Sequence, residues 1–418
     1  MSQWLEQVIG AAQVDDYLAP VRQQALAQLK ADGWPARRNE SWRFTPLTPI
    51  EKREAKTVTQ ADSLPVPVID NLNAIDLLFV DGVLVTQLNT LDVPAGMTIT
   101  SLNNGDNAIQ ADISRVFGQV KPTRHLFGLV NDTLVQHGIY IGVEAGVSID
   151  VPVRIINLSN NDVDAHTRVV VNVADGARAT IIEHGVGDKN SLTTAFAEYH
   201  IADDAHLEHY RFAMFTGAAK QIGGSHFKLH NRSTLNSTLV GYGSELSRLD
   251  VDIHHAGEFA DAKMNAIYLL AEGELFDLHS TIEHAMPNGT TEENARGIVG
   301  DKARAVFNGR IHIHRDAQKT LAELNNRNLL LSRRGVINTK PELEIYADDV
   351  KCAHGATVAE IDEASLYYLL TRGISRSKAL VMLNFGFIRE LINDVRNEPI
   401  RDWLLPVLSE RFSQMEVK

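Results

Sequence analysis

The feature that most constrains this chain is a region, from about residue 76 to about residue 361, of short alternating apolar and polar runs separated by turns. Strand, turn and strand, repeated without helices between them, is what a β-solenoid requires, because each coil buries its inner face only by stacking on its neighbours. We therefore predict a mainly β fold with a β-solenoid core. A large antiparallel sandwich gives similar local signals and stays open as the alternative.

The repeat is visible in the turns of this region. A small or acidic turn lies between two alternating segments, and Gly146, Gly176 and Asp204 place it about every 30 residues, a period typical of repeat architectures. The element recurs as VEAGVSI at 143, VADGARATII at 173, IADDAHLEHY at 201, LAEGELFDLH at 270 and VGDKARAVFNG at 299.

Helical segments are predicted on both sides of the β region. Residues 1–48 carry apolar residues at roughly helical spacing, and residues 49–75 are polar and interrupted by prolines, as in a linker. Near the other end, DEASLYYLLTRG predicts a short helix that ends at Gly373, and SRSKALVMLNFGFIRELINDVRNEP predicts a longer one stopped by Pro399. We expect three parts: residues 1–75, 76–361 and 362–418.

The longer C-terminal helix has apolar residues on more than one face. A single amphipathic stripe would need fewer. Either the helix buries one surface against its own body and another against a second chain, or it is enclosed within its own domain.

Composition excludes several functions. The formal net charge of −13 argues against general binding to nucleic acid or to an anionic membrane, because phosphate affinity depends on clustered Lys and Arg. One cysteine cannot form an internal disulfide, and the first residues lack the basic and apolar stretches of a signal peptide. We expect a cytoplasmic protein that does not span a membrane. Nucleotide-binding P-loop, G-x-S-x-G and H-E-x-x-H motifs are absent.

The stretch EIYADDVKCAHGATVAEID contains the only cysteine, Cys352, two residues before His354. Strand alternation places Val350, Cys352 and His354 on one face. A thiol and an imidazole suit iron or zinc, but two ligands are too few for a closed site. Either this face packs on the core, or the remaining ligands come from another chain.

Histidines elsewhere suggest a rival function. In RIHIHR, His312 and His314 point from one face of a strand, so a metal-dependent enzyme on a β-solenoid is the second hypothesis, and a polar outer face is the simpler interpretation. Adjacent strand residues point to opposite faces, so His254 and His255 cannot easily share one ion. The pair His279 and His284 is ambiguous in the same way as His312 and His314.

Three motifs resemble the SufB/SufD family of the SUF iron-sulfur cluster assembly machinery. KPELEIYADDVKCAHGATVAEID resembles its C-terminal signature, VGDKARAVFNGRIHIHRDAQKT followed by NNRNLLLS resembles the preceding motif, and RRNESWRFTPL at 37–47 resembles its N-terminal motif. SufB members usually have His-Glu-Ala where this chain has His354, Gly355 and Ala356, and they are richer in cysteine. The match is therefore to the SufD branch, from which Ala359 departs because glycine is frequent there.

The resemblance implies a right-handed parallel β-helix between helical terminal domains. It implies a non-catalytic scaffold that pairs with SufB through the β-helices and docks the SufC ATPase through its C-terminal helices, so that ATP acts only through SufC. A transient iron-sulfur cluster would form at the SufB–SufD interface, with His354 as a metal ligand or as a residue that orients one, and Cys352 secondary. A homodimer of the isolated chain is also possible.

Overall fold

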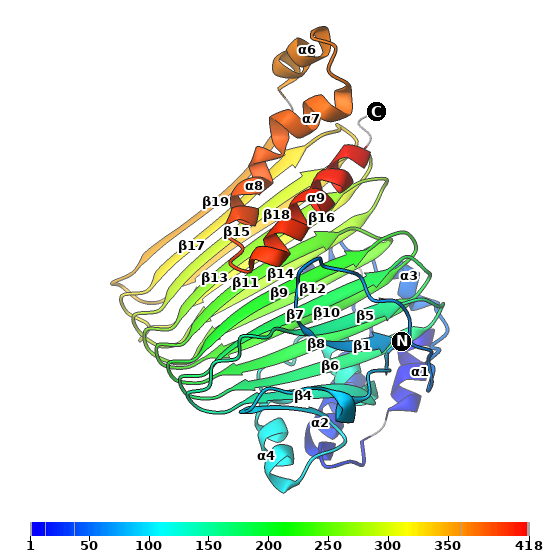
Figure 1. Cartoon of the computed structure of the whole chain (residues 1–418), viewed down its shortest axis with the longest axis vertical. Coiled ribbons are helices and arrows are strands. Elements are labelled where there is room, and N and C mark those ends of the chain that lie inside the picture. The colour runs from blue at the N-terminus through cyan, green and yellow to red at the C-terminus, as the bar shows by residue number, and fades with distance from the viewer. Residues whose placement is uncertain (1, 13, 37, 361, 416–418) are drawn as a thin grey trace.

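The chain folds into two facing β-sheets, and from β4 onward successive strands alternate between them (Figure 1). The structure is a computed structural model that describes residues 2–12, 14–36, 38–360 and 362–415. Sheet A has the order β19-β17-β15-β13-β11-β9-β7-β5-β1-β2, and sheet B the order β18-β16-β14-β12-β10-β8-β6-β4-β3. From β4 to β17 every strand pairs in parallel with the strand two positions further along the chain. The predicted β-solenoid is confirmed, and the antiparallel sandwich is wrong.

The strands are β1 (Ile75–Val80), β2 (Val83–Leu84), β3 (Met97–Ser101), β4 (His137–Val143), β5 (Val153–Ser159), β6 (Asp164–Val173), β7 (Arg178–Gly187), β8 (Leu192–Ile201), β9 (His206–Phe215), β10 (Lys220–Leu229), β11 (Thr234–Tyr242), β12 (Leu246–His255), β13 (Asp261–Leu270), β14 (Leu275–His284), β15 (Thr290–Val299), β16 (Arg304–Ile313), β17 (Leu321–Leu330), β18 (Val336–Ile345) and β19 (Lys351–Glu360). The helices are α1 (Gln3–Ala11), α2 (Ala19–Asp32), η1 (Glu40–Trp42), α3 (Thr48–Glu51), η2 (Leu88–Thr90), α4 (Asn107–Val116), α5 (Leu126–Leu134), α6 (Glu363–Thr371), α7 (Arg376–Asn384), α8 (Gly386–Asn393) and α9 (Glu398–Gln414).

The predicted turn repeat is confirmed, but its turns lie on two opposite edges of the solenoid. Gly146, Gly176 and Asp204 have positive φ angles of 72°, 67° and 58°, and they follow strands of sheet B. Their backbone N–H groups donate to the carbonyls of the next coil, Gly146 to Asp175 and Gly176 to Asp203, both at 2.8 Å. The segments at 270 and 299 instead lead from sheet A back to sheet B, so they stack on the opposite edge.

The main core lies between the two sheets, where alternate residues of every strand point inward. On β16, for example, Ile311 and Ile313 are completely buried. The inner face is built from aliphatic side chains stacked from coil to coil, which is how a solenoid hides apolar surface without a second domain.

Helices cover the outer face of each sheet. Side chains of α1, α2 and α5 pack on Phe196, Ile222 and Leu246 of sheet B, whereas side chains from α6 to α9 share a cluster with sheet A. The helices α4 and α5 were not predicted, since they lie inside the range expected to be mostly β. Within the described ranges, no helix has the length and apolarity needed to cross a membrane.

The C-terminal helices differ from the prediction in detail. Gly373 follows α6 with φ 77°, the left-handed conformation expected after a helix. The long predicted helix is divided at Phe385 into α7 and α8, and Pro399 lies in the first turn of α9 rather than stopping a helix. Proline is tolerated there because the first helical N–H groups have no partner within the helix. The predicted boundary at Ile361 falls on a residue outside the described ranges, and the three-part division stays a prediction.

Candidate functional site

The last coil of the solenoid, formed by β18 and β19, is open. Among the described residues, β18 pairs only with β16, and β19 only with β17, so each presents one unpaired edge. Large apolar side chains are 40% to 60% exposed in this coil, namely Val336, Ile345, Tyr346 and Val358. An unpaired edge with exposed apolar side chains is a ready site for pairing with another chain.

The opposite end of the solenoid is covered. The short strand β2 pairs antiparallel with β1, and β3 pairs antiparallel with β4. Leu84, Leu88, Leu91 and Val93 from this segment pack against the main core. Within the described ranges, the end formed by β18 and β19 therefore lacks the capping segment that repeat proteins need for an exposed terminus, and the other end has one.

Cys352 and His354 both lie on β19, in this open coil. Cys352 aligns with Ala322 of β17, and His354 aligns with Leu324, which are completely buried inward-facing residues. The predicted shared face is thus confirmed, and it is the inward face. Cys352 is half-buried and packs on the core, and burial raises the pKa of its thiol. His354 remains exposed because no further coil covers it. Its role as a ligand stays a prediction.

The rival pair, His312 and His314, lies on the outer face of sheet B, opposite the buried isoleucines of the same strand. The two rings are 4.6 Å apart between centroids. His312 Nδ1 is 2.9 Å from Glu344 Oε2, and His314 Nε2 is 2.5 Å from Glu283 Oε1. Each histidine therefore has its own carboxylate partner. His255 faces the core while His254 faces outward, as alternation predicted.

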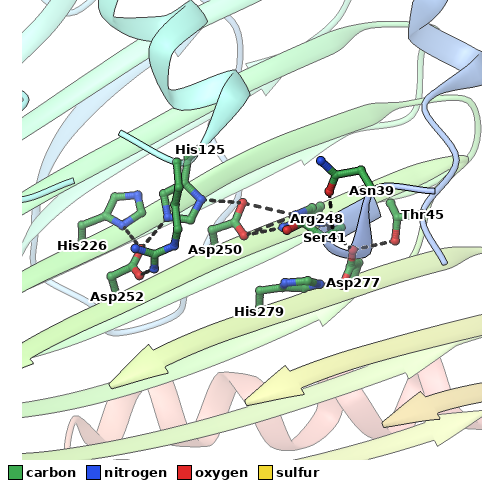
Figure 2. Close-up of polar contacts among 11 residues, drawn as sticks. Asn39, Ser41, Thr45, His125, His226, Arg248, Asp250, Asp252, Asp277 and His279 are labelled. Carbon is green, nitrogen blue, oxygen red and sulfur yellow. Dashed lines mark hydrogen bonds and ion pairs between the residues drawn. The ribbon is translucent and has the colours of Figure 1, made fainter. Parts of the chain in front are cut away.

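A polar network joins the N-terminal motif to the outer face of sheet B (Figure 2). Thr45 donates to Asp277 Oδ2 at 2.6 Å, and the Arg248 guanidinium lies 4.1 Å from the centre of the Trp42 ring. Arg248 also donates to Asp250 Oδ1 at 2.8 Å. These contacts explain why a segment without regular strands is held on the solenoid.

The same network contains a cluster that the sequence did not reveal. In the described part of the chain, one group of at least three His, Cys, Asp or Glu residues brings its potential metal ligands within 4.8 Å of one another: His125, His226 and Asp252. Neither His312 nor His354 belongs to such a group. His125 and Asp252 are 127 residues apart, and no local motif connects them.

Fold and site together define a class: a β-solenoid with one capped end, one open end that presents a thiol and an imidazole, and helices on both outer faces. Residues 155–387 match the family described as SUF system FeS cluster assembly, SufBD core domain, and residues 6–155 match the SufBD protein N-terminal region. The chain belongs to the SufBD family and takes part in iron-sulfur cluster assembly by the SUF system.

Individual relatives agree with this assignment. The iron-sulfur cluster assembly protein SufD of Escherichia coli is 30% identical, over 94% of this chain and 93% of that protein. An iron-sulfur cluster assembly SufBD family protein of Synechocystis is 28% identical over 93% of this chain and 90% of its own length. The SufD protein of Bacillus subtilis is 24% identical over 70% and 68%.

Proposed function

We propose that this chain is the non-catalytic SufD scaffold of a SufB–SufC–SufD complex, in which it pairs with SufB through its open coil. The observation that carries the proposal is the asymmetry of the solenoid. One end has its own cap, and the other leaves two strand edges and apolar side chains uncovered. A second β-helix that stacks on β18 and β19 would satisfy these edges and continue the core.

We also propose that the nascent iron-sulfur cluster forms at this pairing surface. His354 is exposed on the inward face of β19, and Cys352 is half-buried beside it. Two ligands on one chain form half of a site, and an iron-sulfur cluster generally takes four. SufB would supply the others, so cluster formation would require both chains.

The cluster role is tested by His354→Ala in the complex co-expressed with SufB and SufC. Iron and acid-labile sulfide per complex are measured, and complex assembly is checked by size-exclusion chromatography. We expect an intact complex that has lost most of its cluster. The matched control is His314→Ala, because the side chain of this histidine is 43% exposed but lies on the outer face of sheet B, and the cluster yield of this variant should equal that of the wild type. A wild-type yield in an intact His354→Ala complex would exclude this role.

The pairing surface is tested separately with two alanines of β19. Lys351 N–H donates to the carbonyl of Thr320, the residue just before β17, so alternation directs the N–H of Ala353 toward β17 and that of Ala356 toward the free edge. Ala356→Pro should abolish SufB binding and leave the stability of the isolated chain almost unchanged. Ala353→Pro should instead lower that stability by roughly 1 kcal/mol or more, because a ladder hydrogen bond is lost. SufB binding by the Ala356→Pro variant would refute edge pairing.

We further propose that α6 and α7 dock the SufC ATPase, through which ATP would act. These two helices project past the last strands (Figure 1), although Leu366, Ala379 and Leu380 on their inner side join the same apolar cluster as α8 and α9. Tyr367 and Tyr368 of α6 and Met382 of α7 are 70%, 57% and 63% exposed. Aromatic and methionine side chains in a projecting segment are typical of protein interfaces.

Met382→Asp tests this docking surface. Binding of SufC to the isolated chain, measured by calorimetry, should weaken by roughly fivefold or more if Met382 lies in the interface core. Val68→Asp is the control, because Val68 is 70% exposed and lies in the segment before β1, outside α6 and α7. If the Met382→Asp variant and the Tyr368→Asp variant both bind SufC with unchanged affinity, docking at α6 and α7 is contradicted.

A further inference from the structure

A second site lies on the outer face of sheet B, away from the open coil. His226 of β10 and Asp252 of β12 are direct partners in the register of two adjacent strands, so their side chains lie together. His125 immediately precedes α5, which packs over these strands. Three strand spacings separate β12 from β18, which is about 15 Å. The site is thus distinct from His354, which belongs to the other sheet.

The three side chains converge on one oxygen atom. Asp252 Oδ2 is 2.7 Å from His125 Nε2 and 2.7 Å from His226 Nδ1 (Figure 2). A first-row divalent ion takes imidazole and carboxylate ligands at about 2.0–2.2 Å, which places those ligand atoms about 3 Å apart. Both N···O distances are a few tenths of an ångström shorter than that, and all three potential ligand atoms lie within 4.8 Å of one another, so the side chains would have to draw apart slightly to admit an ion.

The two histidines hydrogen-bond to the Asp252 carboxylate through the nitrogens that would bind the ion. A contact of 2.7 Å to a carboxylate oxygen requires a proton on the nitrogen, so a bound ion would replace the protons on His125 Nε2 and His226 Nδ1. His226 Nε2 is buried and, among the described residues, has no hydrogen-bond partner. His125 Nδ1 faces Asp250 Oδ2 at 3.7 Å, and Arg248 holds this carboxylate in place. At 3.7 Å this contact is longer than a hydrogen bond, and a closer approach would give the carboxylate–histidine arrangement that orients ligating rings around metals.

One side of the site opens into a cavity, and one positively charged side chain would compete with an ion for Asp252. Asp252 and Arg124 line a cavity of about 430 Å³, which also contains Thr281, Glu283 and His254. Water from this cavity could complete the coordination of an ion. Arg124 forms an ion pair with Asp252 Oδ1, and its side chain is 48% exposed. Its positive charge opposes a cation at Oδ2, and its exposure lets it move aside.

We propose that His125 Nε2, His226 Nδ1 and Asp252 Oδ2 form a binding site for a divalent first-row transition-metal ion, with water in the neighbouring cavity as further ligands. Two imidazoles and one carboxylate with open positions are the ligand set of non-haem Fe²⁺ sites and suit Co²⁺ and Zn²⁺ as well. The inference does not depend on pairing with SufB or SufC, and it is tested on the isolated full-length chain.

Co²⁺ is the probe, because its visible absorption reports both binding and coordination. The chain is first treated with a chelator and then titrated with Co²⁺, and Fe²⁺ binding is measured in parallel by anaerobic equilibrium dialysis. We expect one ion per chain in the wild type. His125→Gln keeps a hydrogen-bond donor for Asp252 but removes a ligand, and it should weaken binding by at least about tenfold. His314→Gln should bind like the wild type.

Arg124→Gln separates a metal site from a merely structural cluster. Removal of the competing charge should strengthen Co²⁺ binding several-fold, whereas loss of a structural ion pair would not affect metal affinity. This variant changes a half-exposed side chain, so it remains decisive if His125→Gln fails to fold. The proposal is overturned if the wild type binds no Co²⁺, if folded His125→Gln binds it like the wild type, or if Arg124→Gln leaves the affinity unchanged or lower.

Discussion

Glu293 provides a quantitative test of the solenoid interior. It lies on β15 and points inward, in the same row as Leu324 of β17 and His354 of β19. Its side chain is completely buried, and its one hydrogen bond among the described residues comes from Ser280, whose hydroxyl donates to Oε1 at 2.6 Å. Oε2 has no partner there. Burial raises the pKa of Glu293 from 4.5 to about 7, and the Ser280 bond offsets only part of this.

The raised pKa makes the free energy of unfolding depend on pH. Between about pH 4.5 and pH 7 the unfolded chain releases the Glu293 proton while the folded chain keeps it. The stability that the protein has with Glu293 protonated is therefore fully present below pH 4.5, and it is lost as the pH rises through 7. The interval is about 2.5 pH units, each worth about 1.4 kcal/mol, so the loss is about 3 kcal/mol. Glu293→Gln resembles the protonated acid but cannot ionise. It should match the wild type near pH 4.5 and exceed it by about 3 kcal/mol near pH 8.

The assay is urea unfolding of both proteins at about pH 5 and about pH 8, followed by circular dichroism. All other titrating groups are shared, so they cancel in the difference between variants. Glu323→Gln is the control, because Glu323 lies on the exposed outer face of the adjacent strand β17, and its effect should not change with pH in this way. A stability difference between Glu293→Gln and the wild type that is the same at both pH values would refute the reasoning.

Three further predictions concern other parts of the molecule. Burial favours the neutral form of Glu183, but Arg211, which donates to Oε2 at 2.6 Å, helps to lower the Glu183 pKa to about 2. Arg211→Met should therefore cost about 3–5 kcal/mol at neutral pH and less below about pH 4.5, as measured by urea unfolding. Ile388→Ala should cost about 2–5 kcal/mol and increase hydrogen exchange in α8, because Ile388 is completely buried against sheet A. Trp42→Ala should cost roughly 1 kcal/mol by removing the ring beneath Arg248, and it should speed proteolysis between residues 38 and 47, whereas unchanged cleavage would contradict the role of this contact.

The solenoid could be predicted because its signal is local. Alternation along each strand decides which residues face the core, and the turn repeat sets the length of a coil. Both patterns can be recognised within about 30 residues of sequence. The shared face of Cys352 and His354 follows from the same rule. The two kinds of turn could not be separated, because Gly176 and Gly273 are both left-handed turn glycines although they lie on opposite edges.

The C-terminal helices show where local rules stop. Apolar residues on several faces correctly indicated contact with the body, since Leu391 and Ile392 pack on sheet A. The number of apolar residues in this segment could not show that the helix would divide at Phe385 into α7 and α8, or that Met382 would stay exposed. These outcomes depend on the shape of the sheet surface beneath the helices.

By itself, the sequence determined the β-solenoid, the inward side of each strand and the family, because each rests on patterns within one coil or one motif. The tertiary structure decided which end of the solenoid is open, since capping depends on how residues 81–101 fold back on the first coil. It also decided the cluster of His125, His226 and Asp252, whose members come from a helix start and two strands. Such a site exists only when coil stacking and helix packing bring distant residues within a few ångströms, and no spacing along the chain records that distance.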